Sequence, residues 1–197
     1  MPYEALPSIN HVEQNGTFSW LSGLPAGDSA LDFERNNANV LVRLDQLSEQ
    51  AATQKLQLPS PFTQFLSSPE IYRRVPTCTS CYLDLSTTLL DAPGADGKLI
   101  RFMNDQQCVL LWYLFLRVGY EPSVVVAIPE WLDDSDDKGL DEAVRLTNLT
   151  MCAGTFEEFM FRFWLENTIW YSLYEGRVLT DFQYAYVRAA KAARPQV

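Results

Sequence analysis

The spacing of apolar residues predicts helices in the first third of the chain. Val40, Leu44, Leu47 and Ala51 recur at intervals that place them on one face of a helix over residues 38–53. Two Ser-Pro pairs, at 60–61 and 68–69, then predict two short helices, because the first helical turn tolerates proline. The chain therefore opens its regular structure with three helices.

The pattern becomes extended after residue 76. Cys81, Leu83 and Leu85 alternate with Tyr82 and Asp84, which is typical of a half-buried strand. Further strands are predicted over residues 99–103 and 124–128. The run 108–116 is apolar throughout, and it suits either a buried helix or a strand buried on both faces. Its Val, Trp, Tyr and Phe residues favour a central strand.

Helical spacing returns near residue 155. Thr155 and Glu158 match a capping box, and Gly176 suits a helix end. Between them the aromatic residues keep helical spacing, which favours packing against the sheet over a cofactor site. These residues are Phe156, Phe159, Phe163, Trp164, Trp170, Tyr171 and Tyr174. A last helix is expected over residues 180–193.

The order of helices, then strands, then helices predicts an α+β fold, in which an antiparallel meander is flanked by N-terminal and C-terminal helices. A length of 197 residues suits one domain. Its core is expected over about 38–175, with an irregular arm over 1–35 that packs on the domain through residues such as Phe18 and Trp20.

This layout resembles the SUKH superfamily, which includes yeast cell-wall-assembly regulators and bacterial toxin-immunity proteins. Three stretches carry the resemblance: the Leu-Pro entry and short helix of 58–66, the meander of 83–128, and the Thr-Phe-Glu-Glu-Phe-Met helix start of 155–160. The resemblance implies a single SUKH-like domain with an antiparallel or mixed sheet of four to six strands. It also implies a binding role, as in immunity proteins that neutralise cognate toxins, and it transfers no individual site residue.

The formal net charge of -10 and the pI of about 4.5 restrict the class of partner that the chain can bind. An acidic surface repels phosphates, which disfavours nucleic acids and anionic membranes and favours a basic protein partner. The start of the chain lacks a targeting signal, and the longest apolar run, 108–116, is too short to span a bilayer. With four cysteines, the chain is expected to be cytoplasmic.

Catalytic chemistry finds little support in the sequence. The one histidine, His11, lies in the irregular arm, so no histidine-based relay is expected. Cys78 and Cys81 form a C-x-x-C pair whose alternatives are structural packing, zinc binding and redox chemistry. We expect packing, no metal and no cofactor. Arg101 and Arg162, in apolar surroundings, are expected to pair with a carboxylate or to extend their charge to solvent.

The candidate binding site is an acidic run beside apolar residues. Four aspartates follow a tryptophan and a leucine, but they lack the spacing and the glycine of a calcium-binding loop. An exposed tryptophan next to charges is a common hot-spot arrangement, whereas a buried tryptophan with solubilising aspartates is the alternative. The predicted partner-binding residues are Trp131, Leu132, Asp133, Asp134, Asp136 and Asp137.

The sequence therefore predicts a non-catalytic protein-binding module of the immunity type, which neutralises a toxin by binding it. One alternative is a regulatory or scaffolding protein of the same fold. Another is a small-molecule sensor or an enzyme that uses the aromatic helix and the cysteines. A toxin-like neighbouring gene favours the first hypothesis, and a ligand retained through purification favours the last.

Overall fold

The computed structural model describes residues 3–9, 14–27, 29–33, 39–129 and 146–193. In these ranges the chain forms an antiparallel sheet flanked by helices, which confirms the α+β prediction. Two 3-10 turns, η1 (Tyr3–Ala5) and η2 (Ser19–Leu21), precede the helices α1 (Val40–Thr53), α2 (Ser60–Ser67) and α3 (Pro69–Tyr72). No helix in the described part is long and apolar enough to cross a membrane.

Six strands follow in the described ranges. They are β1 (Tyr82–Leu83), β2 (Leu90–Asp91), β3 (Lys98–Asn104), β4 (Leu111–Leu116), β5 (Ser123–Pro129) and β6 (Leu146–Ala153). The sheet order is β1-β3-β4-β5-β6, with β2 also paired to β3, and every pair is antiparallel. The prediction that residues 99–128 form adjacent antiparallel strands, with residues 109–116 supplying the central one, is confirmed, although that strand covers only Leu111–Leu116.

The central strand begins at Leu111 and not at Cys108 because Asp105 holds the preceding turn. The carboxylate of Asp105 accepts the backbone N–H groups of Val109 and Leu110, at 2.7 and 3.0 Å. Cys108 adopts a left-handed conformation with φ 55. The Asp105 carboxylate therefore takes up the N–H groups of Val109 and Leu110, which would otherwise be available to extend the sheet.

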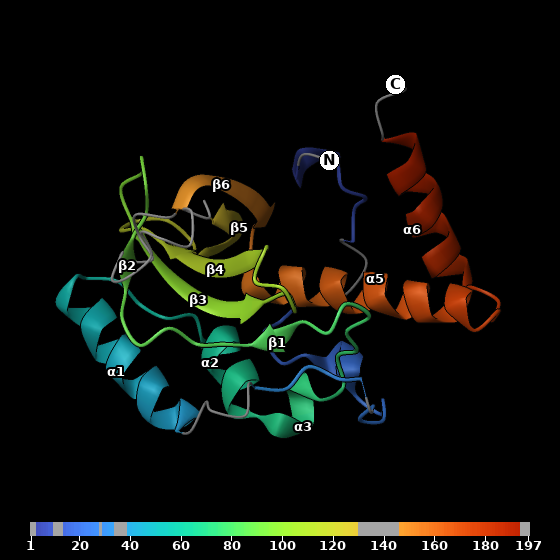
Figure 1. Cartoon of the computed structure of the whole chain (residues 1–197), viewed down its shortest axis with the longest axis horizontal. Helices are drawn as coiled ribbons and strands as arrows, with labels where there is room; N and C mark the ends of the chain where they lie inside the picture. The colour runs from blue at the N-terminus through green and yellow to red at the C-terminus, as the bar shows by residue number, and fades with distance from the viewer. Residues whose placement is uncertain (1–2, 10–13, 28, 34–38, 130–145, 194–197) are drawn as a thin grey trace, which may run out of the picture.

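One face of the sheet carries the main core. The helices α1, α2 and α5 (Phe156–Tyr174) cover it, and α5 passes beneath the sheet in Figure 1. The ring of Phe156 contacts those of Phe18, Phe62, Phe65 and Phe102, at centroid distances of 5.1–6.4 Å. The N-terminal arm thus contributes to the core, as predicted. The opposite face bears a smaller cluster of Leu90, Ala92, Leu99, Leu111, Tyr113 and Val125.

The helix α5 is longer than the sheet surface it covers. Its 19 residues extend over about 28 Å, and in Figure 1 it continues past the sheet toward α6 (Asp181–Ala192). The α6 helix then turns back and packs on α5 through a third cluster, which contains Phe161, Leu165, Ile169 and Tyr186. It begins with a full capping box made by Thr180 and Gln183. This signature is present in the sequence but was not among the predicted features.

Candidate functional site

The start of α5 is a buried polar anchor for the N-terminal arm. Glu157 is only 3% exposed, and its carboxylate accepts the backbone N–H groups of Gly16 and Phe18 and the indole N–H of Trp20. In the sequence, the position of this glutamate in the first turn of the helix has a local explanation in the helix dipole and the capping box. The carboxylate instead joins the helix to a segment about 140 positions earlier in the chain.

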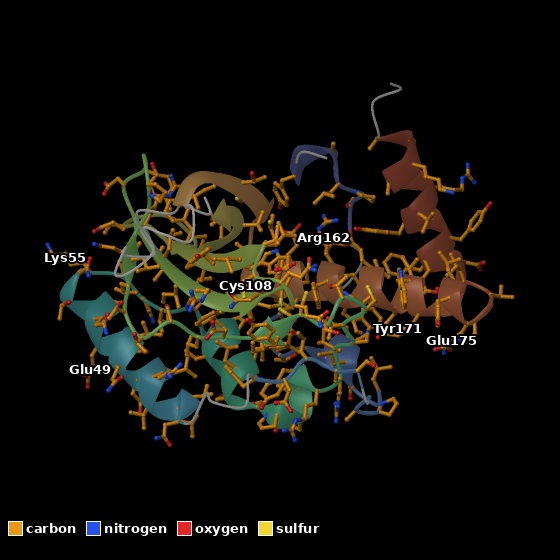
Figure 2. The ribbon with its side chains drawn as sticks, viewed as in Figure 1. Glu49, Lys55, Cys108, Arg162, Tyr171 and Glu175 are labelled. Atoms are coloured by element: carbon orange, nitrogen blue, oxygen red, sulfur yellow. The ribbon has the colours of Figure 1, made fainter. Side chains whose placement is uncertain are left out.

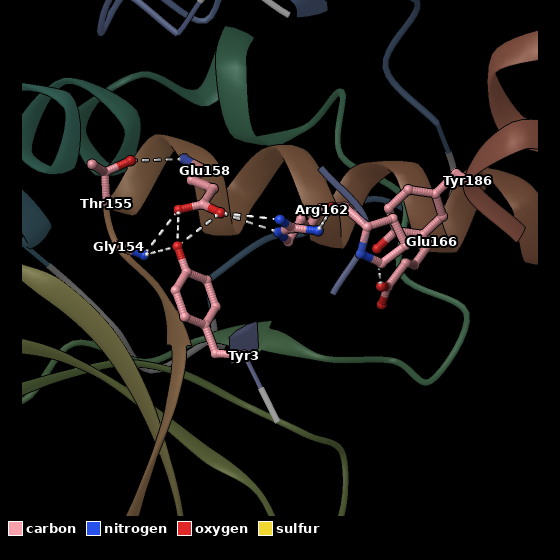
Figure 3. Close-up of polar contacts among 8 residues, drawn as sticks. Tyr3, Gly154, Thr155, Glu158, Arg162, Glu166 and Tyr186 are labelled. Atoms are coloured by element: carbon pink, nitrogen blue, oxygen red, sulfur yellow. Dashed lines mark hydrogen bonds and ion pairs between the residues drawn. The ribbon is translucent and has the colours of Figure 1, made fainter. Parts of the chain in front are cut away.

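Glu158 makes a second anchor beside the first (Figure 3). The predicted capping box is half formed, since Thr155 Oγ1 accepts the N–H of Glu158 at 3.1 Å. The carboxylate of Glu158 accepts the hydroxyl of Tyr3 and the N–H of Gly154, both at 2.9 Å, and pairs with Arg162 at 3.1 Å. Because Tyr3 and Pro7 of the arm are both bonded to this cluster, we interpret the cluster as structural.

The two arginines behave as the sequence predicts. Arg162 pairs with Glu158 and also donates to the carbonyl of Pro7 at 2.7 Å. Arg101 pairs with Asp84 at 3.0 Å on the sheet. Both cations therefore stabilise buried or half-buried carboxylates, and neither is left as an isolated charge.

The four cysteines are free thiols, and each has different neighbours. Cys81 is buried and bonded to Thr79, whereas the backbone N–H of Cys78 donates to Asn167. Cys108 contacts the hydroxyl of Tyr82 at 3.1 Å, and burial raises the pKa of that tyrosine to about 12. In the ranges that the structure describes, no three His, Cys, Asp or Glu residues gather as a metal site. His11 lies outside those ranges.

Burial controls the acidity of three thiols. Desolvation raises the pKa of Cys78 and Cys81, and it raises the pKa of Cys152 from 9.0 to about 11. A thiolate is the reactive form, so a raised pKa suppresses nucleophilic and redox chemistry near neutral pH.

We expect native Cys152 to react with iodoacetamide at pH 7.5 at least ~10-fold more slowly than in the urea-unfolded chain, because desolvation of this half-buried thiol lowers its thiolate fraction below that of the unfolded chain. Peptide mass spectrometry of timed samples measures both rates. The stabilisation from the protonated thiol is complete below pH 9 and is lost as pH rises through about 11. Equal rates in the folded and unfolded chains would contradict this prediction.

Among the residues that the structure describes, an exposed apolar surface lies where α5 extends beyond the sheet. Phe159 and Phe163 pack on Trp112 of β4, at centroid distances of 6.3 and 6.5 Å. The same helical stripe continues to Trp170 and Tyr174, which the strands no longer reach. The prediction that the aromatic helix packs on the sheet is therefore correct for its first half and wrong for its end.

We define the α5 tip as Trp170, Leu173, Tyr174 and Val178. These side chains are 43%, 60%, 76% and 94% exposed. The rings of Trp170 and Tyr174 stack at 5.0 Å with an interplanar angle of 9°. Single exposed apolar residues are common on protein surfaces, whereas neighbouring ones that include two stacked aromatics are typical of an interaction site.

A cleft of about 630 Å³ lies between α5, α6 and the loop that contains Pro76, and Val178 is the one residue of the α5 tip that lines it. Its walls include Trp164, Tyr171, Phe182 and the tip residue Val178. The hydroxyl of Tyr171 donates to the carbonyl of Thr77 at 3.1 Å, which fixes this wall. Figure 2 labels Tyr171 near this end of α5, together with Glu175, which pairs with Arg177 at 2.9 Å.

The predicted binding residues cannot be compared with this surface. Trp131, Leu132, Asp133, Asp134, Asp136 and Asp137 all lie outside the described residues. The α5 tip is thus a site that sequence reasoning missed. The available signal was the length of the aromatic stripe, which exceeds what a sheet of short strands can cover. No family model, curated protein or solved structure matches the chain.

Proposed function

We propose that this chain is a non-catalytic protein-binding module that holds its partner at the α5 tip. The observation that carries the proposal is the exposed, stacked pair of Trp170 and Tyr174 at the end of α5. Aromatic side chains of this kind dominate the binding energy of protein interfaces.

The proposed biological role is that of an immunity-type protein, which neutralises a toxin by occupying it. Support comes from the SUKH-like layout of the sequence and from the α+β arrangement of helices around an antiparallel sheet. The net charge of -10 favours a basic partner at long range, because opposite net charges accelerate encounter. Regulation or scaffolding by the same fold would use the same surface with another partner.

Site-specific photocrosslinking in the native cell tests the proposal. Benzoylphenylalanine at position 174 should cross-link to one defined protein, because Tyr174 lies in the proposed contact. The matched control is position 41, since Leu41 is also exposed, at 61%, but lies on α1. Identical cross-linked products at both positions, or none at 174, would reject the α5 tip as the contact.

The cleft also favours a second candidate function, a small-molecule sensor. Its volume of about 630 Å³ is within the range of ligand pockets, and its walls are largely apolar and aromatic. Native mass spectrometry of the purified chain distinguishes the two. A bound compound that is lost when Thr168→Trp fills the cleft would support the sensor, whereas a ligand-free chain that cross-links through position 174 supports the protein-binding module.

A further inference from the structure

A second exposed surface is formed by the turn between β4 and β5. We define the β4–β5 turn surface as Phe115, Arg117, Val118, Tyr120 and Met151. Val118 and Tyr120 are 63% and 64% exposed, and Met151 on the neighbouring β6 is 37% exposed. This surface shares no residue with the α5 tip.

Arg117 is held in place by aromatic rings. Its guanidinium carbon lies 4.2 Å from the ring centroid of Tyr120 and 5.0 Å from that of Phe115. Gly97 permits this packing, because a Cβ there would lie 2.5 Å from a ring carbon of Phe115 and 2.7 Å from Cγ of Arg117. Stacking of this kind fixes the plane of the guanidinium and leaves the N–H groups at its edge free to donate.

No described carboxylate uses those donors. Other described arginines that lie near acidic side chains form ion pairs with them, as Arg101 does with Asp84 and Arg162 does with Glu158. Glu121 follows four residues after Arg117 and borders the same hollow, yet no ion pair joins the two. Arg117 is therefore an ordered cation whose hydrogen-bonding edge faces a ligand or solvent.

An apolar hollow of about 640 Å³ lies next to this cation, on the face of the sheet that points away from α5. Its floor is formed by Phe115, Val125, Leu149 and Met151, and Arg117 and Tyr120 stand at its rim. A ligand that matches both the arginine and the apolar hollow carries a carboxylate next to apolar atoms. The net charge of -10 makes a polyanion such as nucleic acid a poor match, whereas a single carboxylate is compatible with it.

We propose that the β4–β5 turn surface binds an aspartate or glutamate of a protein partner, with the carboxylate on Arg117 and the flanking apolar side chains in the hollow. Arginine and carboxylate form paired, charge-assisted hydrogen bonds, which are stronger than neutral ones and geometrically specific. This contact is separate from the α5 tip, so each surface can fail its test while the other passes.

Titration of the isotopically labelled chain with three probes tests the inference by NMR. The probes are the blocked peptides acetyl-Leu-Glu-Leu-amide and acetyl-Leu-Gln-Leu-amide, and sodium acetate. The glutamate peptide should shift the Arg117 Nε–H signal and the Met151 methyl signal together and saturably. The glutamine peptide and acetate should each bind at least ~10-fold more weakly, because one lacks the charge and the other lacks the apolar groups.

Two variants complete the test. Arg117→Lys keeps the positive charge but loses the paired N–H donors of the guanidinium, and it should weaken binding of the glutamate peptide severalfold. Arg188→Gln, on α6, removes another arginine for which no ion pair or hydrogen bond is found in the described part, and it should leave the affinity unchanged. Equal affinity for both peptides, equal affinity for acetate, or an equal loss in the two variants would overturn the proposal. The amide spectrum of each variant verifies that it is folded.

Discussion

Replacing Phe156 by alanine should lower the free energy of unfolding by about 3–5 kcal/mol, the range for large aromatic residues truncated in a core. Phe156 is 2% exposed and stands where the arm, α2 and β3 meet α5. Its ring contacts one aromatic residue from the arm, two from α2 and one from β3, so no single neighbour can move to fill the cavity. The loss should therefore lie toward the upper end of the range.

Urea unfolding followed by circular dichroism measures this loss as a lower midpoint at an unchanged slope. Tyr174→Ala is the matched control, since it removes an aromatic ring from the same helix at a position that is 76% exposed. Its stability should change by less than about 1 kcal/mol. Similar midpoints for Phe156→Ala and the wild-type chain would mean that α5 does not close the core.

Replacing Glu157 by alanine should cost about 3 kcal/mol, because it leaves the backbone N–H of buried Phe18 and the indole N–H of half-buried Trp20 without their acceptor. Glu157 is almost fully buried and joins the arm to α5, so the loss should concentrate in the arm. Besides the lower unfolding midpoint, we expect faster amide hydrogen exchange at Phe18. The core strand β4 should exchange as in the wild type after correction for global stability.

The control for this prediction is Glu49→Ala. Glu49 is exposed on α1 and is labelled in Figure 2, far from α5 along the chain. It should shift the midpoint by no more than about 0.5 kcal/mol. If Glu157→Ala leaves hydrogen exchange at Phe18 unchanged, the carboxylate does not anchor the arm.

The strands β1, β3, β4 and β5 were predictable because strand signals are local, whereas β2 and β6 were not assigned from the sequence. The alternation at Cys81, Leu83 and Leu85 indicates which residues face the core, and so does the apolar run that ends at Leu116. Short turns then make neighbouring strands pair antiparallel. The exact start of β4 was not predictable from apolarity, since the side chain of Asp105 competes for the backbone N–H groups of Val109 and Leu110. Such local competition depends on geometry that a hydropathy pattern does not contain.

The anchors of α5 were beyond sequence reasoning for another reason. Acidic residues in a first helical turn have an adequate local explanation in the helix dipole, so Glu157 and Glu158 gave no sign of their contacts with the arm. Those contacts span 137–155 positions, and only the folded chain brings them together. The α5 tip differs, because the length of the aromatic stripe was a signal for it, although helical spacing alone does not tell where the sheet beneath a helix ends.

Binding calorimetry with the partner identified by cross-linking tests most directly whether the α5 tip is the binding surface. The wild-type chain is compared with the Trp170→Ala, Tyr174→Ala double variant and with the Leu41→Ala, Val42→Ala double variant, whose targets are equally apolar and exposed on α1. We predict that the first pair raises Kd at least ~30-fold, about 2 kcal/mol, and that the second changes it less than about twofold. Comparable affinities for all three folded proteins would contradict the assignment of the α5 tip as the binding surface.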